Sequence, residues 1–504
     1  MKHHLRLLAA FAFVCCHAFA GERPRPGKAH LYLTQYENVL GTSMEMKIAA
    51  SSRLASDGAG AAVLNEISRM SKILSGYDAK SEFSRWLQTR GQAVHVSREL
   101  FEVLDLFDQW RVRTDGALDA SAEVITRIWK AASAQGRVPA TDELSTAVNE
   151  VKQVHWTLDR QAQTATHLTA TPLVLNSFAK SYIIKHAAEV AMRKGGVDGI
   201  VVNIGGDLVI SGKIDETIRI SDPKADAENE TPIGTFNVSN KAVATSGSYR
   251  RGELIGGHWY SHIVDPRTGQ PADNIISATV VASDATVAGA LATAFNVLSP
   301  EESQSLASRI PGVEYLIITR EGRRVESPGW KMDGAGPGER ETNNATAQEG
   351  NGDFELVVNL EINLQKEGFV KRPYVAVWVE DENHAPVRCL TVWHGSDKYL
   401  PELRSWYLKY RSLYTTDKNF NTSATSATRP AGKYTVKWDG KDDQGNFVKP
   451  GKYTVKIEAA REHGTYQLMR QEIVWNESPK RIDLTGNIEI ASASLDYRKK
   501  TNDK

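Results

Sequence analysis

A polar stretch about two thirds of the way along the chain limits what this protein can fold into. It runs from Asp333 to Asp353, is rich in Gly, Asn, Glu and Thr, and contains almost no large apolar residues. Such a segment cannot bury enough apolar surface to order itself. A chain of 504 residues also exceeds what one hydrophobic core usually serves. We therefore predict two domains, residues 21–332 and 354–497, joined by a linker at residues 333–353.

The charge balance argues against nucleic acid as a partner. The sequence carries 61 basic and 61 acidic residues, for a formal net charge of zero. Proteins that neutralise many phosphates usually show clustered Lys and Arg with a clear positive excess. Hydrophobic residues make up 41% of the chain, enough for large cores.

The first twenty residues have the pattern of a secretory signal peptide. Lys2 and Arg6 precede an apolar run that ends in Ala18-Phe19-Ala20. The alternative is a transmembrane anchor, but the run is shorter than the roughly twenty apolar residues that a helix needs to cross a bilayer. We predict cleavage and a periplasmic protein without a transmembrane span. Of the three cysteines, only Cys389 then remains, and we expect it to be a buried apolar residue rather than part of a disulfide.

Patterns of helix and strand alternate irregularly in the first region. Apolar residues at helical spacing predict helices over residues 61–78 and 96–116, the second capped by Ser97. Short β-branched runs predict strands within residues 199–214 and 277–283, followed by a helix at 284–299. Without a regular βαβ repeat, the fold class is α+β.

The second region alternates apolar and polar residues as strands do. This pattern predicts an all-β, antiparallel sandwich of immunoglobulin-like architecture, without the paired cysteines of antibody domains. Gly, Asn and Pro in residues 441–452 indicate a hairpin-like connection. The predicted strands lie within residues 354–364, 372–381, 386–393, 433–461 and 468–475.

Three stretches of the first region combine residues that a plain core does not need. Two glycines in Asn203–Asp207 allow close approach of a ligand or of another backbone, with Asp207 at the tip. The hydroxyls and arginines of residues 245–251 suit phosphate oxygens, or simply form a solvated loop. Gly289 and Thr293 lie one helical turn apart on a face of small residues, which favours close packing.

The segment HIVDPRTGQP, residues 262–271, allows two interpretations. Pro266 and Gly269 suit a tight turn. His262 is able to relay a proton near neutral pH, with Asp265 three residues on as a group to orient it. The residues alone leave both open. Zinc-ligand, nucleophile-elbow, phosphate-loop and GxGxxG patterns are absent from the sequence.

Taken in order, these stretches resemble the ApbE family, the exported FAD:protein FMN transferases. The resemblance covers roughly Leu40 to Thr319, and the second region resembles a domain of unknown function, DUF2271, that follows an ApbE-like part in some bacterial proteins. The motifs that carry it are LGTSMEM, GALDAS, LNSFAKSY, VVNIGGDLVISG, ATSGSYRR, YSHIVDPRTGQP and GALATAFNVL.

The resemblance implies a reaction and its participants. Family members cleave FAD at its pyrophosphate and attach the FMN half, by a phosphoester bond, to a Thr or Ser of an exported partner flavoprotein, releasing AMP. FAD would be the substrate and Mg²⁺ the ion that neutralises the phosphates. The family's catalytic base falls on His262. Its flavin-nucleotide contacts fall on Ala117, Leu118, Asp119 and Lys180, to which we add Asp207.

The predicted metal ligands agree with the family only in part. The resemblance places the backbone oxygen of Ser177 and the hydroxyl of Thr293 on the ion. Where the family has its aspartate ligand, this chain has Gly289, and Val174 replaces a second aspartate that contacts FAD. Asp284 is the nearest carboxylate in sequence, with helix capping as its alternative role. Two further functions stay open: hydrolysis of FAD to FMN and AMP, and non-catalytic flavin binding or partner docking.

Overall fold

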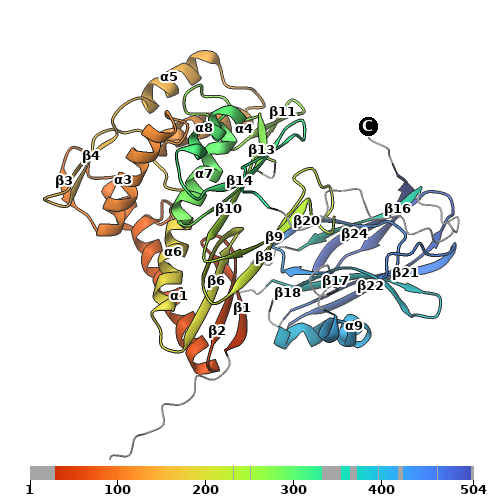
Figure 1. Cartoon of the computed structure of the whole chain (residues 1–504). Coiled ribbons are helices and arrows are strands. Elements are labelled where there is room, and N and C mark those ends of the chain that lie inside the picture. The colour runs from red at the N-terminus through yellow and green to blue at the C-terminus, as the bar shows by residue number, and fades with distance from the viewer. Residues whose placement is uncertain are drawn as a thin grey trace, which may run out of the picture.

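An antiparallel eight-stranded sheet organises the first domain of this computed structural model (Figure 1). Every neighbouring pair in it is antiparallel. The strands follow each other across the sheet in chain order: β1 (His30–Val39), β2 (Thr42–Ala50), β6 (Val197–Ile204), β7 (Asp207–Gly212), β10 (Ala242–Gly247), β13 (Ile275–Ala282), β14 (Glu314–Thr319) and β15 (Arg324–Glu326).

The structure describes residues 29–331 and 353–500, apart from residues 231, 250, 364–371, 396, 418, 419, 421–423, 462 and 463. The predicted signal peptide and all of the predicted linker except Asp353 therefore lie outside the described residues. Within the described part, no helix combines the length and the apolar character that crossing a membrane requires.

Both faces of the large sheet are buried, because its strands carry apolar residues at consecutive positions. In β6, Ile200 and Val202 join the core beneath the helices, whereas Val201 belongs to the core on the opposite face. Helices α1 (Arg53–Leu74), α6 (Ala179–Met192) and α7 (Ala285–Val297) cover the first face, and the hairpin of β8 (Asp215–Ile220) and β9 (Gly234–Ser239) contributes to the second core.

Local signals in the sequence located several of these helices. Ser97 caps α3 (Arg98–Arg113), accepting a hydrogen bond from the Leu100 amide at 3.3 Å, as predicted. Helix α1 begins earlier than predicted, because Ser52 caps it and the small residues that follow lack the apolar spacing we looked for. The α+β class of this domain agrees with its mixture of helices and antiparallel strands.

The remaining elements of the first domain form a helical layer and short hairpins beside the large sheet. They are α2 (Glu82–Trp86), β3 (Ala93–His95), the 3₁₀ helix η1 (Ala120–Ala122), α4 (Glu123–Ala134), α5 (Thr141–Val151), β4 (Trp156–Asp159), β5 (Thr164–His167), β11 (Gly252–Ile255), β12 (His258–Ser261) and α8 (Pro300–Ser308).

Two antiparallel-dominated sheets that share one core make up most of the second domain (Figure 1). The four-stranded sheet has the order β20-β16-β24-β23, and the five-stranded sheet has the order β19-β18-β17-β21-β22. Their bounds are β16 (Phe354–Ile362), β17 (Tyr374–Asp381), β18 (Pro386–His394), β19 (Thr425–Ala427), β20 (Gly432–Trp438), β21 (Gly451–Ala460), β22 (Tyr466–Trp475), β23 (Lys480–Thr485) and β24 (Ile490–Lys499). Its immunoglobulin-like classification stays a prediction.

Two expectations for this domain were wrong. The domain is not all-β, because α9 (Arg404–Thr416) follows the 3₁₀ helix η2 (Asp397–Glu402) and packs Trp406 and Tyr410 on the outer face of the five-stranded sheet. The connection at residues 441–452 does not close a hairpin either. Strand β20 pairs with β16 and β21 pairs with β17, so the connection passes from one sheet to the other.

Cys389 is buried, as the sequence predicted. Its sulfur lies 3.3 Å from the indole nitrogen of Trp406, and burial raises the pKa of the thiol. It therefore acts as a core residue and not as a thiolate nucleophile.

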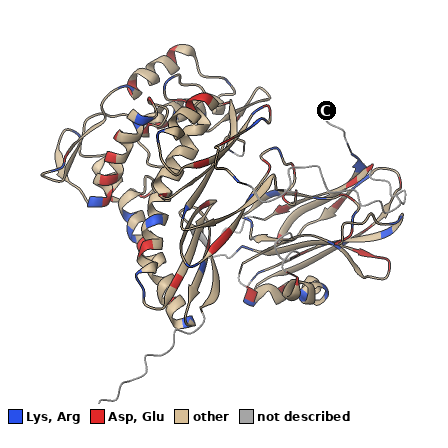
Figure 2. Cartoon of the chain, viewed as in Figure 1, with Lys and Arg blue, Asp and Glu red and all other residues tan. Residues whose placement is uncertain are grey.

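A loop of the first domain covers the edge strand of the second. Strand β20 lies at the edge of its sheet, and Asn229 pairs with its backbone: the side-chain amide donates to the Lys437 carbonyl at 2.7 Å and accepts from the Lys437 amide at 2.9 Å. The backbone amide of Glu228 donates a hydrogen bond to the Thr435 carbonyl oxygen. The Glu228 carboxylate forms an ion pair with Arg429 Nη2 at 2.9 Å. Figure 2 shows basic and acidic residues interspersed along both domains, in line with the zero net charge.

Replacing Asn229 with Ala tests this contact. The change leaves the amide and carbonyl of Lys437 without their partner, which we expect to lower the free energy of unfolding by about 1–3 kcal/mol. Urea unfolding followed by tryptophan fluorescence measures it. The exposed Gln92→Ala variant serves as the control for loss of a surface amide, and equal stability of the two variants would contradict the proposed role of Asn229.

Candidate functional site

Lys180, Ser181 and Asp207 form one polar cluster between α6 and the start of β7. The ammonium of Lys180 lies 3.3 Å from Asp207 Oδ2 and 3.4 Å from the Gly205 carbonyl oxygen. The hydroxyl of Ser181 donates to the same Asp207 oxygen at 2.9 Å. Burial raises the pKa of Asp207, and Lys180 and Ser181 partly oppose that rise. The structure thus brings together two of the predicted binding residues.

The two glycines of the NIGGD segment form the turn between β6 and β7. Gly205 and Gly206 have φ of 58° and 90°, and they join β6 to β7 where Ile204 pairs with Asp207. Positive φ at both central residues is the geometry of a tight type I′ hairpin, which glycine adopts without steric cost. The turn fixes Asp207 at the first position of β7, against Lys180.

Ser177 and Thr293 also meet, as the resemblance implied. The hydroxyl of Thr293, on α7, donates to the backbone oxygen of Ser177 at 3.0 Å. These two oxygens satisfy each other, and both are uncharged. Gly289, one turn earlier on α7, faces Ser181 of α6. Close packing of the two helices therefore accounts for the small-residue face that the sequence showed.

Asp284 caps α7. Its Oδ1 accepts hydrogen bonds from the amides of Thr286 and Val287 at 2.8 and 3.2 Å, and its Oδ2 pairs with Lys185 at 2.6 Å. Burial tends to raise the pKa of Asp284, but these partners outweigh burial and lower it. An α-helix rises about 1.5 Å per residue, so Asp284 lies about 13 Å along the helix from Thr293. At this separation Asp284 and Thr293 cannot bind the same ion. Asp284 therefore has its alternative role, that of helix cap, and the predicted role as a metal ligand was wrong.

The residues present do not fit a Mg²⁺ site of the expected kind. Mg²⁺ binds in near-octahedral geometry and prefers carboxylate oxygens, supplemented by water. Thr293 and Ser177 offer only neutral oxygens, and the carboxylate of Asp207 is already held by Lys180 and Ser181. Within the described ranges, no group of three His, Cys, Asp or Glu side chains is placed to hold a metal ion.

His262 is held in one tautomer by the backbone. Its ring Nδ1 lies 3.0 Å from the carbonyl oxygen of Arg251, which only accepts, so Nδ1 carries the proton. Nε2 is then the nitrogen with a free lone pair. The side chain reaches solvent at the surface, which leaves Nε2 accessible to a hydroxyl.

The surroundings of His262 favour its neutral form. Partial loss of solvent around the ring is the main cause that lowers the pKa of His262. The charges of Arg251 and Lys130 lower it further, and the hydrogen bond to the Arg251 carbonyl opposes them. A neutral imidazole at pH 7 is the form that accepts a proton.

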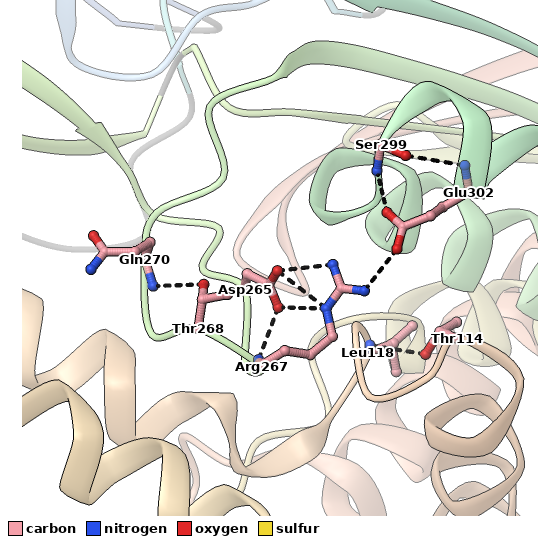
Figure 3. A network of polar contacts seen from close by, with 8 residues as sticks. All are labelled: Thr114, Leu118, Asp265, Arg267, Thr268, Gln270, Ser299 and Glu302. Carbon is pink, nitrogen blue, oxygen red and sulfur yellow. Dashed lines mark hydrogen bonds and ion pairs between the residues drawn. The ribbon is translucent and has the colours of Figure 1, made fainter.

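The loop after His262 is a tight turn locked by Arg267 (Figure 3). The amide of Gly269, which has φ of 76°, donates to the Asp265 carbonyl at 2.8 Å. Arg267 Nη2 and Nε lie 2.9 and 3.0 Å from the two Asp265 carboxylate oxygens, and Arg267 Nη1 lies 3.1 Å from Glu302 of α8. Asp265 therefore orients Arg267 and not His262, so the tight turn is confirmed, and proton relay by His262 stays a prediction.

Ala117, Leu118 and Asp119 directly follow Gly116, which lies next to the Arg267 side chain of this loop. Ala117 and Leu118 are buried, and the Leu118 amide donates to the Thr114 hydroxyl at 3.0 Å (Figure 3). Asp119 Oδ1 caps η1 by accepting from the Ser121 amide and hydroxyl, and Arg111 Nε lies 2.9 Å from its Oδ2. Ala117 and Leu118 are part of the core, and Thr114 accepts from both of their amides, so of the three residues only Asp119 borders a cleft.

A cleft of about 470 Å³ lies between Asp119 and the turn at residues 262–271. Its lining includes three cationic residues that the sequence did not indicate as a group, Arg111, Lys152 and Arg267, together with the carboxylates of Asp115 and Asp119. Their separation along the chain hid them, because each lies in an ordinary amphipathic helix or turn. Arg111 is paired with Asp119, and Arg267 is paired with Asp265 and Glu302, so the lining is of mixed charge.

The hydroxyls of residues 245–251 are largely occupied inside the protein. Thr245 pairs with the hydroxyl of Thr279 at 3.0 Å, and Ser248 donates to the Ile275 carbonyl at 3.0 Å. The Ser246 carbonyl accepts from Asn296 of α7. Residue 250 lies outside the described residues. This stretch therefore ties α7 and β13 to the hairpin before His262, and its phosphate contacts remain a prediction.

Comparison with known proteins identifies the first domain. The ApbE family model matches residues 40–317, more than half of the chain, and the model described as "Predicted periplasmic protein (DUF2271)" matches residues 355–492. The FAD:protein FMN transferase of Escherichia coli K12 is 25% identical over 327 residues, covering 63% of this chain and 92% of the relative. The FAD:protein FMN transferase of Haemophilus influenzae is 29% identical over 259 residues, covering 49% of this chain and 74% of the relative.

Solved structures agree. The ApbE protein of Thermotoga maritima superposes with a TM-score of 0.53 and 26% identity, covering 59% of this chain and 97% of that one. The flavinyl transferase ApbE of Pseudomonas stutzeri, in its apo form, shares the fold with a TM-score of 0.50, covering 60% and 95%. Together with the order of the motifs around His262, Lys180 and Thr293, these matches show that the chain belongs to the ApbE family.

Proposed function

We propose that this chain is an exported FAD:protein FMN transferase. It cleaves FAD at the pyrophosphate and joins FMN by a phosphoester bond to a Thr or Ser of an exported flavoprotein, with release of AMP. The observation that carries the proposal is the fixed tautomer of His262, which leaves Nε2 free to accept a proton. The named relatives carry out this class of reaction, and the signal-like leader together with the DUF2271 match supports a periplasmic location.

The chemistry needs a base and a grip on the dinucleotide. Nε2 of His262 takes the proton of the acceptor hydroxyl as its oxygen forms a bond to the phosphorus of the FMN half. The bond from that phosphorus to the bridging oxygen breaks, and AMP leaves with the bridging oxygen. Lys180, and Lys152 in the cleft, supply positive charge for an anionic ligand, while Arg111 and Arg267 are already paired with carboxylates. We assign Ala117, Leu118, Asp119 and Asp207 to positioning within this site.

A second candidate is a flavin-binding or partner-docking protein without catalysis. Gly289 stands where the family has a charged metal ligand, and Ser181 occupies the space in front of it, which favours this non-catalytic candidate. Hydrolysis of FAD with water as the acceptor is the third outcome, and the same assay detects it. Incubating the chain with FAD and an exported FMN-binding protein encoded nearby separates the three: FMN mass on the protein, free FMN with AMP, or intact FAD.

Replacing His262 with Ala tests the base. We expect transfer of FMN, measured as added mass on the acceptor, to fall by about 100-fold or more, the range that general-base catalysis contributes. FAD binding, measured by flavin fluorescence, should change little. His258, an exposed histidine of the hairpin that precedes His262, provides the control as His258→Ala. Transfer that survives in His262→Ala at the rate of the control removes His262 from the mechanism.

The pH dependence provides an independent test. The base is active when deprotonated, and the pKa of His262 is lowered from its ordinary value of 6.5. Activity should therefore be complete at pH 7 and decline as the pH falls through a midpoint below 6.5. The dependence of kcat/KM on pH measures this. An acid limb with its midpoint above pH 7 would contradict the assignment, as would a profile that His262→Ala leaves unchanged.

A further inference from the structure

The packing of α6 on α7 leaves no room for a side chain at residue 289. An ideal Cβ on Gly289 would lie 2.3 Å from Ser181 Oγ and 2.9 Å from Ser181 Cβ. Contacts this short do not occur between non-bonded carbon and oxygen atoms in packed interiors. Ser181 is only 2% exposed, so its side chain has little space to move aside. A serine at 181 and any side chain at 289 therefore exclude each other.

The hydroxyl of Ser181 is committed to a second task. It donates to Asp207 Oδ2, which Lys180 also approaches, so a buried carboxylate is satisfied by one hydroxyl and one ammonium. Removing either donor would leave that carboxylate poorly paired in the interior. The Ser181 side chain thus both closes the space in front of Gly289 and stabilises Asp207.

Lys180 retains a hydrogen-bond donor for a ligand. Its ammonium has three N–H groups, and its partners are the Gly205 carbonyl and Asp207. The side chain is 32% exposed, so a ligand in solvent can reach it. A phosphate oxygen is a strong acceptor for such a group.

We propose that the Ser181–Gly289 pair closes the divalent-cation position of this site, and that Lys180 contacts the phosphates of FAD without a divalent cation. The first half concerns the protein alone. The second half rests on the proposed function, because it requires FAD to be the ligand. It follows that an aspartate introduced at residue 289 fits between the helices only when Ser181 is also replaced by glycine.

Manganese binding by the metal-stripped full chain tests the first half, with electron paramagnetic resonance as the readout. The unsubstituted chain, Gly289→Asp and Ser181→Gly should each show no Mn²⁺ signal that depends on Thr293. The double variant Ser181→Gly/Gly289→Asp should gain one bound Mn²⁺ per chain, and adding Thr293→Val should abolish it. A signal in the unsubstituted chain that Thr293→Val removes would overturn the proposal, as would a signal in Ser181→Gly alone.

FAD binding, followed by flavin fluorescence, tests the second half. The Kd of the unsubstituted chain should be the same in Mg²⁺ and in EDTA, and Lys180→Met should raise it by about tenfold or more, as expected for loss of a charge-assisted contact. Lys185→Met, on the same helix but paired with Asp284, is the matched control and should leave Kd unchanged.

The two failures are distinguishable. FAD that binds the unsubstituted chain only in Mg²⁺ overturns the role of Lys180 and leaves the proposed function standing. FAD that binds under neither condition overturns the proposed function together with that role, while the manganese measurement still decides whether the cation position is closed. Folding of each variant is checked by circular dichroism, and the unsubstituted chain and Thr293→Val decide the first half if the double variant does not fold.

Discussion

The close approach of α6 and α7 over the large antiparallel sheet is the constraint on which the site depends. Helix α7 is buried along nearly its whole length, and its small residues allow the two backbones to approach each other. That approach brings Thr293 within hydrogen-bond distance of the Ser177 carbonyl and packs Gly289 against Ser181. The hydrogen bond from Ser181 in turn positions Asp207. A larger side chain on the shared face would separate the helices and disperse the cluster, because packed interiors absorb added volume poorly.

Electrostatics divides the site into two parts with different properties. Around Asp207, burial disfavours charge, and one ammonium and one hydroxyl keep the carboxylate satisfied. At the turn of residues 262–271, Pro266 and Arg267 line a cleft of mixed charge, and the imidazole of His262, at the start of the turn, is kept neutral. The first part is a buried, mutually paired cluster, while the second provides the proton acceptor that the proposed phosphoryl transfer would use.

Features set by neighbouring residues could be predicted from the sequence, whereas contacts between distant residues could not. Ser97 and Asp284 cap helices through amides two or three residues away, and the turn at Gly269 follows from its own residue types. The family resemblance located His262, Lys180 and Thr293. Nothing in the sequence showed that Ser181 faces Gly289, that Arg267 rather than His262 engages Asp265, or that β20 and β21 belong to different sheets. Helix α9 was missed although its aromatic residues recur at helical spacing, because strand patterns on both sides dominated the interpretation.

The side chain of Asn229 against β20 has a consequence for how the two domains persist together. An uncovered edge strand offers a row of free backbone donors and acceptors, onto which strands of other molecules can add. Asn229 and Glu228 occupy part of that row from within the same chain. Separating the two domains would expose this part of β20 as a template onto which a strand of another molecule can add.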